Sequence, residues 1–280
     1  MKIIRTVSAL NLALQPIRSN GDSIGLVPTM GALHEGHAAL IRKSIDENRC
    51  TVVSLFVNPT QFNNQQDLQC YPRTPEADQQ LLEQLGVDLL FAPPFEEVYP
   101  EPDRRQFDFG LLDKVMEGAY RPGHFNGVAQ VVSRLFSFVQ PDKAYFGEKD
   151  FQQLAIVREM THRLQIPVEI VSVPTVREPS GLAMSSRNLR LTPRQRENAS
   201  QIWRVLQNSL LHQGHFTPQE LAARVADEIN NIPDLRVEYY AIVDGYSLQP
   251  LTSWDESEWR VGCVAVYCGE VRLIDNIRYR

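Results

Sequence analysis

His34 and His37 lie three residues apart, directly after a short apolar run, within the stretch GLVPTMGALHEGHAALI. The run predicts a buried strand over 24–27, and a helix is expected to open near His37. Gly31 and Gly36 permit tight turns between these elements. Ligands of open α/β sheets bind beyond the carboxyl ends of strands, and helix N-termini favour anions, so this loop is predicted to bind phosphate. Both imidazoles then face the anion and stabilise charge that develops on it.

Two other interpretations compete for this histidine pair. A histidine near a helix end is more often a cap or a solvated group, which is our interpretation of His162, His212 and His215. The order His34-Glu35-Gly36-His37 is also similar to a zinc-hydrolase motif. That motif reads H-E-x-x-H, with its ligands at i and i+4 of an established helix. No third ligand is suitably spaced, so we predict no protein-borne metal site.

Polar residues also follow the next predicted strand. Asn58 and Gln61 come after the apolar run 51–57, which places them at the same carboxyl edge of the sheet as the histidines. The Gln61 amide can donate and accept hydrogen bonds, which suits a hydroxy acid as ligand. Ordinary turn formation at an Asn-Pro pair explains the same residues equally well.

The segment Gly147–Asp150 repeats this arrangement, because it follows a predicted strand over 143–146 and precedes a predicted helix. Lys149 is a point charge that suits phosphate. Asp150 suits a helix N-cap, a ribose hydroxyl or a magnesium-bound nucleotide. Gln153, one turn further on, is expected to face the same cavity.

The elements that must position these residues alternate between short runs rich in Val, Ile and Phe and stretches of helical period. This alternation predicts an α/β fold, with a Rossmann-like parallel sheet and flanking helices. The predicted strands are 24–27, 51–57, 87–91, 143–146 and 168–173, and the predicted helices are 37–48, 75–85, 128–139 and 151–164. Residues 93–109 hold four prolines and no sustained period, so we expect a surface excursion there.

A change of composition near residues 174–192 marks a domain boundary, and we divide the chain into domains 1–175 and 176–280. The second is predicted to be a smaller α+β domain with an antiparallel sheet. Two Thr-Pro pairs predict helix starts with a threonine N-cap and proline at the first helical position. The expected helices are 193–212 and 218–230, and the expected strands are 237–243, 261–267 and 271–274. Arg177 and Glu178, near the boundary, are interpreted as a surface pair.

Composition excludes several classes of function. Hydrophobic residues make up 43% and charged residues 22%, as in soluble globular proteins and unlike disordered chains. The 28 Lys and Arg against 34 Asp and Glu give a net charge of -6, which argues against nucleic acid or a membrane surface as partner. No apolar run has the length of a membrane span, and polar residues interrupt the N-terminal stretch, so we expect a cytoplasmic protein. The four cysteines show no paired spacing and are predicted to be reduced, buried thiols.

The His34-x-Gly36-His37 element resembles the HIGH signature of the nucleotidylyltransferase superfamily, whose members bind ATP and attack its α-phosphate. Four further segments resemble, in order along the chain, those of the pantoate–beta-alanine ligases (pantothenate synthetases) within that superfamily. These segments are Val57–Phe62, Tyr71–Thr74, Phe146–Leu154 and Pro174–Asn188. The resemblance is dense up to Asn188 and looser beyond it, ending in Leu273-Ile274-Asp275-Asn276. Arg121–Asn126 also resembles a family segment near the ligand pocket.

Ala183–Asn188 resembles the mobile KMSKS-type loop of the superfamily. Ala183 and Ser186 replace its two lysines, which leaves Arg187 as the main cation. Ser185 and Arg187 are then expected to stabilise departing pyrophosphate. A flexible interdomain linker is the alternative interpretation of this segment.

The resemblance implies the ATP-dependent condensation of (R)-pantoate with beta-alanine to pantothenate, AMP and diphosphate, through a pantoyl adenylate. It also implies ATP as co-substrate with Mg²⁺ and a homodimer. Separately from the resemblance, we expect the C-terminal domain to act as a lid. Two alternatives stay open: a nucleotidyltransferase with a phosphorylated acceptor, and a nucleotide-sensing protein without catalysis. Cations at the positions of Gln61 and Gln153 would favour the first alternative.

The same resemblance assigns the site residues. His34, His37, Lys149, Ser185 and Arg187 are the implied catalytic residues, because they supply charge and hydrogen bonds to the phosphates. Pantoate is assigned to Gln61, Gln153 and Met30. The implied ATP-binding residues are Met30, Gly31, Ala32, Leu33, His34, Glu35, Gly36, His37, Gly147, Glu148, Lys149, Asp150, Val176, Met184, Ser185, Ser186 and Arg187.

Overall fold

The computed structural model describes all 280 residues and divides into two compact units. Unit 1 comprises residues 1–109, 121–148 and 156–174, and unit 2 comprises residues 110–120, 149–155 and 175–280. Segments 110–120 and 149–155, which the sequence analysis placed in the first domain, thus group with the C-terminal residues. A boundary after residue 175 stays a prediction for the functional domains.

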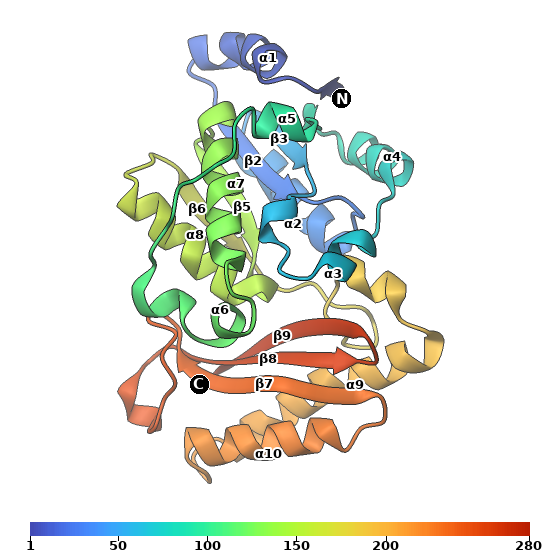
Figure 1. The fold of residues 1–280 in the computed structure, drawn as a ribbon, viewed down its shortest axis with the longest axis vertical. Coiled ribbons are helices and arrows are strands. Elements are labelled where there is room, and N and C mark those ends of the chain that lie inside the picture. Colours follow the sequence, from blue (N-terminus) through green and yellow to red (C-terminus); the bar gives the residue numbers. More distant parts are fainter. The chain divides into compact units, whose positions relative to one another are not determined.

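Unit 1 contains a six-stranded parallel sheet in the order β1-β4-β3-β2-β5-β6. Four of its strands, β2, β3, β5 and β6, are labelled in Figure 1. The strands are β1 (Lys2–Ile4), β2 (Ile24–Thr29), β3 (Cys50–Leu55), β4 (Leu89–Phe91), β5 (Lys143–Gly147) and β6 (Glu169–Val173). Nearly every residue of β2 and β3 is buried, as expected for parallel strands covered on both faces. The predicted α/β fold with a parallel sheet is confirmed. Strand β1 was not among the predicted strands, because it has only three residues and buries only Ile4.

Helices accompany the strands of unit 1. They are α1 (Val7–Ser19), α2 (Glu35–Glu47), α3 (Gln65–Gln69), α4 (Pro75–Leu85), α5 (Phe95–Val98), α7 (His124–Val139) and α8 (Phe151–Arg163), of which α8 begins in unit 2 and ends in unit 1. Helices α2 and α4 share a core with β2 and β3, whereas α1 packs on α7. Helix α1 was not among the predicted helices, because it buries only Leu10 and Leu14 and its apolar stripe is narrow.

The segment 93–109 is more firmly held than a surface excursion would be. Tyr99 and Phe109 are buried, although most residues around them are exposed. The Asp103 carboxylate forms ion pairs with Arg105 at 2.5 Å and with Arg134 at 2.8 Å. The Arg105 guanidinium holds the pKa of Asp103 well below its usual range. Asp103 therefore stays ionised and fixes the segment to α7.

Unit 2 combines helices with a three-stranded antiparallel sheet in the order β7-β8-β9, as predicted. Its elements are α6 (Met116–Tyr120), α9 (Pro193–Ser209), α10 (Pro218–Asn230), β7 (Leu235–Asp244), β8 (Arg260–Cys268) and β9 (Val271–Tyr279). Thr192 and Thr217 form capping boxes at the starts of α9 and α10, each with proline in the first turn. The Thr-Pro pairs were thus correctly interpreted.

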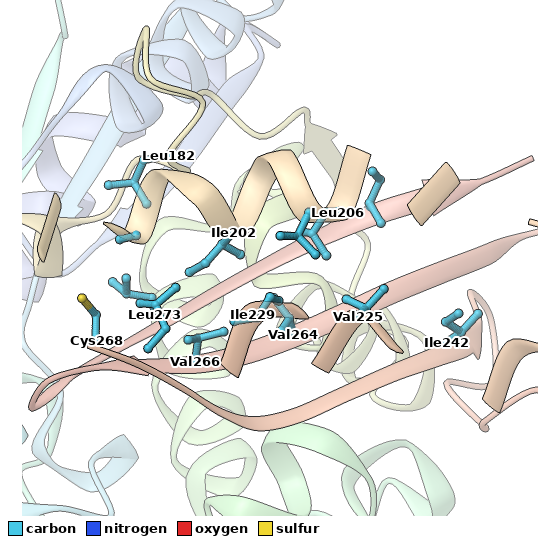
Figure 2. Close-up of a cluster of buried hydrophobic side chains, with 14 of the residues drawn as sticks. Leu182, Ile202, Leu206, Val225, Ile229, Ile242, Val264, Val266, Cys268 and Leu273 are labelled. Carbon is cyan, nitrogen blue, oxygen red and sulfur yellow. The ribbon is translucent and has the colours of Figure 1, made fainter. Parts of the chain in front are cut away.

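Both faces of this small sheet are covered. On one face, α9 and α10 bury a cluster that includes Leu206, Ile229 and Val264 (Figure 2). On the other face, Met116 and Phe151 pack in a second cluster with residues of β7 and β8. This second cluster explains why segments 110–120 and 149–155 belong to unit 2.

Strand β9 is longer than predicted. The prediction ended at Ile274, because Asp275 and Asn276 interrupt the apolar pattern. Alternate residues nevertheless stay buried through Tyr279, and Asp275 occupies one of the buried positions. The alternation of more and less buried residues that is typical of a strand therefore continues through Asp275 and Asn276.

All four cysteines are free, and three are buried. The prediction of a buried thiol was wrong for Cys70, which is exposed at the end of the short helix α3. None of the helices combines the length and the hydropathy that a membrane span requires.

Candidate active site

The turn between β2 and α2 is closed by its two histidines. Helix α2 begins at Glu35, two residues earlier than expected, with His34 as its N-cap. The Gly36 N–H donates to His34 Nδ1 at 3.1 Å, and the His34 N–H donates to His37 Nδ1 at 3.3 Å. The two rings lie 4.1 Å apart between centroids. The pair thus forms a capping box in which imidazoles replace the usual hydroxyl and carboxylate.

This capping box fixes the tautomers of both histidines. Because Nδ1 accepts a hydrogen bond in each ring, a neutral ring must carry its proton on Nε2. Backbone N–H groups at this helix start were expected to bind a phosphate. The N–H groups of His34 and Gly36 bond within the turn instead. The Nε2–H groups of the two rings are therefore the donors that we propose for an anion.

A buried carboxylate, which the sequence analysis missed, supports the same turn from α4. Asp78 is 2% exposed and accepts the N–H groups of Ala32 at 2.9 Å and Leu33 at 2.7 Å. The Thr74 hydroxyl donates to it at 3.0 Å. Gly31 adopts φ 82°, and a Cβ there would lie 3.0 Å from Asp78 Oδ2. Asp78 thus holds a left-handed turn directly before the histidine pair.

We expect Asp78→Asn to lower kcat about tenfold, because the amide leaves one buried N–H of the turn without an acceptor. The matched control is Asp142→Asn, since Asp142 accepts the Ile24 N–H at 2.7 Å at the opposite end of β2. Steady-state kinetics and thermal unfolding of both variants test this. A kcat that changes equally in the two variants would show that Asp78 supports only the fold.

A second group of side chains lies beyond the carboxyl ends of β2 and β3. It consists of the polar Asn58 and Gln61 together with Met30. Gln61 is buried, and its Nε2 lies 2.9 Å from the Met30 sulfur. Asn58 is 1% exposed and donates to the Gly127 carbonyl at 3.1 Å. Burial raises the pKa of Tyr99, so its hydroxyl stays protonated and donates to Asn58 Oδ1 at 3.1 Å. The turn that carries Gln61 is therefore rigidly supported.

A buried histidine holds the Gln61 backbone. His124 Nδ1 lies 2.8 Å from the Gln61 carbonyl, and Arg121 Nη1 lies 3.2 Å from His124 Nε2. A guanidinium only donates, so Nε2 accepts and Nδ1–H donates to Gln61. The segment Arg121–Asn126 therefore contacts the turn that carries Gln61, a residue predicted to bind pantoate. Its place beside the ligand pocket stays a prediction.

Three neighbouring strands bring part of the predicted site together in unit 1. Residues 30–37 follow β2, Gln61 follows β3, and Gly147 and Glu148 lie at the end of β5. Because β3, β2 and β5 are adjacent and parallel, these residues share one edge of the sheet.

The remaining predicted residues lie in unit 2. Lys149 forms an ion pair with Asp150 at 3.2 Å, and Gln153 is partly buried in the first turn of α8. The adjacent Gln152 is 4% exposed and donates to the carbonyls of Leu112 at 2.7 Å and Val115 at 2.9 Å. Gln152 is thus structural, whereas its neighbour Gln153 stays a candidate ligand.

Residues 176–187 form an ordered hairpin followed by a turn. The Met184 N–H donates to the Val176 carbonyl at 3.0 Å, and Arg177 pairs with Ala183 in an antiparallel bridge. The Arg187 N–H then donates to the Ser185 hydroxyl at 3.2 Å. The KMSKS-like residues therefore start from a defined hairpin.

The interpretation of Arg177 and Glu178 as a surface pair was wrong. Arg177 binds Asp275 through two hydrogen bonds, at 2.6 and 2.8 Å, and lies over the Trp203 ring at 3.4 Å. Glu178 binds Arg196 at 2.7 Å. The two residues contact different partners, because successive residues of a hairpin strand face opposite sides.

No group of three or more His, Cys, Asp or Glu side chains is arranged to hold a metal ion. The parallel sheet, the histidine turn at the carboxyl end of β2 and the polar groups at the same edge define a nucleotide-binding α/β enzyme.

Comparisons with known proteins identify the family. The family model of pantoate-beta-alanine ligase matches residues 2–278. The chain is 56% identical to the pantothenate synthetase of Bacteroides thetaiotaomicron over 280 residues, covering 100% of this chain and 99% of that protein. A crystal structure of pantothenate synthetase from Thermus thermophilus matches with 46% identity and a TM-score of 0.93 over 100% of both chains. The structure of the Francisella tularensis ligase complexed with beta-gamma ATP and beta-alanine matches with 35% identity and a TM-score of 0.85, over 99% of this chain and 97% of that one.

The chain belongs to the pantoate-beta-alanine ligase family. Its activity is therefore the ATP-dependent ligation of pantoate to beta-alanine.

Proposed function

We propose that the ligation proceeds in two steps through a pantoyl adenylate. The pantoate carboxylate attacks the α-phosphorus of ATP, a P–O bond forms, and diphosphate leaves with the electron pair of the broken P–O bond. The amine of beta-alanine then attacks the acyl carbon, AMP leaves, and the amine loses a proton. The observation that carries this proposal is the histidine capping box, which fixes two Nε2–H donors at the carboxyl end of β2. Such fixed donors stabilise charge that develops on phosphate oxygens.

Other cationic and polar residues complete the proposed phosphate site. We assign Lys149, Ser185 and Arg187 to the phosphates, together with residues 30–37, 147–150, Val176 and 184–187 as the ATP-binding segments. Lys149 supplies a point charge, and Arg187 supplies a planar fork of donors that suits phosphate. Positioning and charge stabilisation then provide most of the rate enhancement.

The proposed pantoate residues are Gln61, Gln153 and Met30. Gln61 is fixed by contacts to its backbone and to its side-chain amide. An amide recognises hydroxyl and carboxylate oxygens without repelling a developing adenylate, which supports a hydroxy acid over a phosphorylated acceptor.

We further propose Mg²⁺ as the companion of ATP. Mg²⁺ is usually held by phosphates, water and one or two carboxylates, so the residues present fit an ion carried by the nucleotide. Asp150 is the carboxylate in the predicted ATP segments that would contact it. When bound, the ion neutralises phosphate charge.

A homodimer, a cytoplasmic location and a lid role for residues 176–280 also stay proposals. ATP as co-substrate supports the cytoplasmic location. Strand β6 lies at an open edge of its sheet, which leaves one side of that strand available to a partner. Size-exclusion chromatography with light scattering tests the dimer.

The decisive experiment follows AMP and diphosphate release from ATP and Mg²⁺, with pantoate and beta-alanine supplied separately and together. We expect stoichiometric AMP, diphosphate and pantothenate only when both substrates are present. Isotope transfer from pantoate carboxylate oxygen to AMP tests the adenylate, because that oxygen bridges carbon and phosphorus in the intermediate. AMP without the transferred oxygen would contradict the two-step route.

We expect Gln153→Ala to raise the KM for pantoate at least tenfold while the KM for ATP changes less than twofold. The loss of hydrogen bonds to a polar substrate accounts for a rise in KM of this magnitude. The neighbouring variant Gln152→Ala is the control, because it removes hydrogen bonds within unit 2. It should lower the melting temperature and leave the ratio of the two KM values unchanged. Equal effects of Gln153→Ala on both KM values would mark Gln153 as structural.

A further inference from the structure

Two adjacent residues of β9, Asp275 and Asn276, are polar where the sequence pattern expects a strand end. The Asp275 side chain is 6% exposed and receives both Nη groups of Arg177, at 2.6 and 2.8 Å. Arg177 lies at the base of the hairpin 176–184, and its guanidinium also stacks on Trp203. Asp275 therefore anchors the hairpin that leads into Ser185 and Arg187.

Asn276 makes the corresponding contact on the opposite face of β9. Its Nδ2 donates to the Lys149 carbonyl at 3.1 Å. Successive residues of a strand point to opposite faces. Asp275 therefore contacts the hairpin on one face of β9, and Asn276 contacts the Lys149 segment on the other. The Asn276 N–H donates to Asp275 Oδ1 at 2.8 Å, and this hydrogen bond links the two residues directly.

We propose that Asp275 and Asn276 are positioning residues that set the register between the Lys149 segment and the Ser185–Arg187 segment. This inference rests on the proposed function, in which both segments bind the phosphates of ATP. The two segments are far apart along the chain, and β9 holds both within unit 2. A rigid strand fixed on both faces positions them relative to each other better than either loop alone does.

Arg177 and Asp275 suit this role because both are shielded from solvent. Their side chains are 16% and 6% exposed, and the fork of the guanidinium matches the carboxylate. Gly181 allows the hairpin to approach Trp203 closely, since a Cβ at this position would lie 2.6 Å from the Trp203 ring. The hairpin thereby packs closely against Trp203.

The test uses Asp275→Asn and Asn276→Ala in the full-length chain. We expect each to raise the KM for ATP and to lower kcat, about tenfold in kcat/KM for ATP, while the KM for pantoate changes less than twofold. Asp244→Asn is the matched control, because Asp244 accepts the N–H groups of Tyr246 and Ser247 in a turn of unit 2. It should lower the melting temperature without changing either KM.

Double-mutant cycles give a readout that loss of stability alone would not produce. We expect Asn276→Ala to couple with Lys149→Ala, and Asp275→Asn to couple with Arg187→Ala, so that each second substitution has little further effect on kcat/KM. The crossed pairs, Asn276 with Arg187 and Asp275 with Lys149, should be closer to additive. Additive behaviour in all four cycles overturns the proposal.

The single variants separate this inference from the proposed function. Lys149→Ala and Arg187→Ala with wild-type kinetics would contradict the proposed phosphate site itself. If both lose activity while Asp275→Asn and Asn276→Ala behave like Asp244→Asn, only the positioning inference fails. Circular dichroism and melting temperatures verify the fold, and Asn276→Ser, a milder change, replaces Asn276→Ala if that variant does not fold.

Discussion

His37→Ala is expected to lower kcat about 100-fold or more while the chain keeps its fold. Removal of one electrostatic catalyst typically lowers kcat by about this factor. The substitution deletes an Nε2–H donor and also the Nδ1 acceptor of the His34 N–H. Steady-state measurement of AMP release, with circular dichroism and thermal unfolding, tests this expectation.

His37→Gln separates the two losses. Glutamine at this third helical position can accept the N–H of the cap residue, as in an ordinary capping box. We therefore expect its melting temperature to stay close to that of the wild type while kcat remains low. Near wild-type kinetics in both variants would remove His37 from the catalytic residues.

Arg272→Met is expected to lower the free energy of unfolding by about 3 kcal/mol, because it leaves buried carboxylates without their cation. Arg272 binds Glu117 at 2.6 Å and Glu238 at 2.5 Å, and its side chain is 18% exposed. The Tyr239 hydroxyl also donates to Glu117 at 2.8 Å. Urea-induced unfolding measures the change.

A compensated variant tests the cause of this loss. Combining Arg272→Met with Glu117→Gln and Glu238→Gln removes all three charges at similar volume. We expect this triple variant to regain most of the stability, because neutral buried groups cost far less than unpaired carboxylates. A triple variant as unstable as Arg272→Met would indicate that the packing of the arginine stem, and not charge, is what matters.

The sequence predicted the main elements of both sheets, because their signals are local. Buried strands such as β2 and β3 appear as continuous apolar runs, and the Thr-Pro starts of α9 and α10 carry their caps within four residues. The grouping of segments 110–120 and 149–155 with unit 2 could not be predicted. It depends on Met116 and Phe151 packing against strands that lie more than eighty residues further along the chain.

Some residues of the candidate site could likewise be predicted from the sequence, and others could not. The histidine turn and Gln61 could be found, because glycines, histidines and an Asn-Pro pair mark them in the sequence. Asp78 could not, since its neighbours in α4 form an ordinary helix and its role appears only when Ala32 and Leu33 approach it. Asp275 likewise becomes informative only once Arg177 lies beside it.

The exposed thiol of Cys70 makes this enzyme suitable for site-specific labelling without mutagenesis. Burial raises the pKa of Cys50 to about 12 and that of Cys268 to about 11, and it also raises the pKa of Cys263. Those three thiols therefore supply little reactive thiolate near neutral pH, whereas Cys70 is open to reagent. Cys70 follows the turn that carries Gln61, a proposed pantoate-binding residue. If pantoate binds there, a fluorophore attached to Cys70 would report its binding in the wild-type sequence as a change in emission.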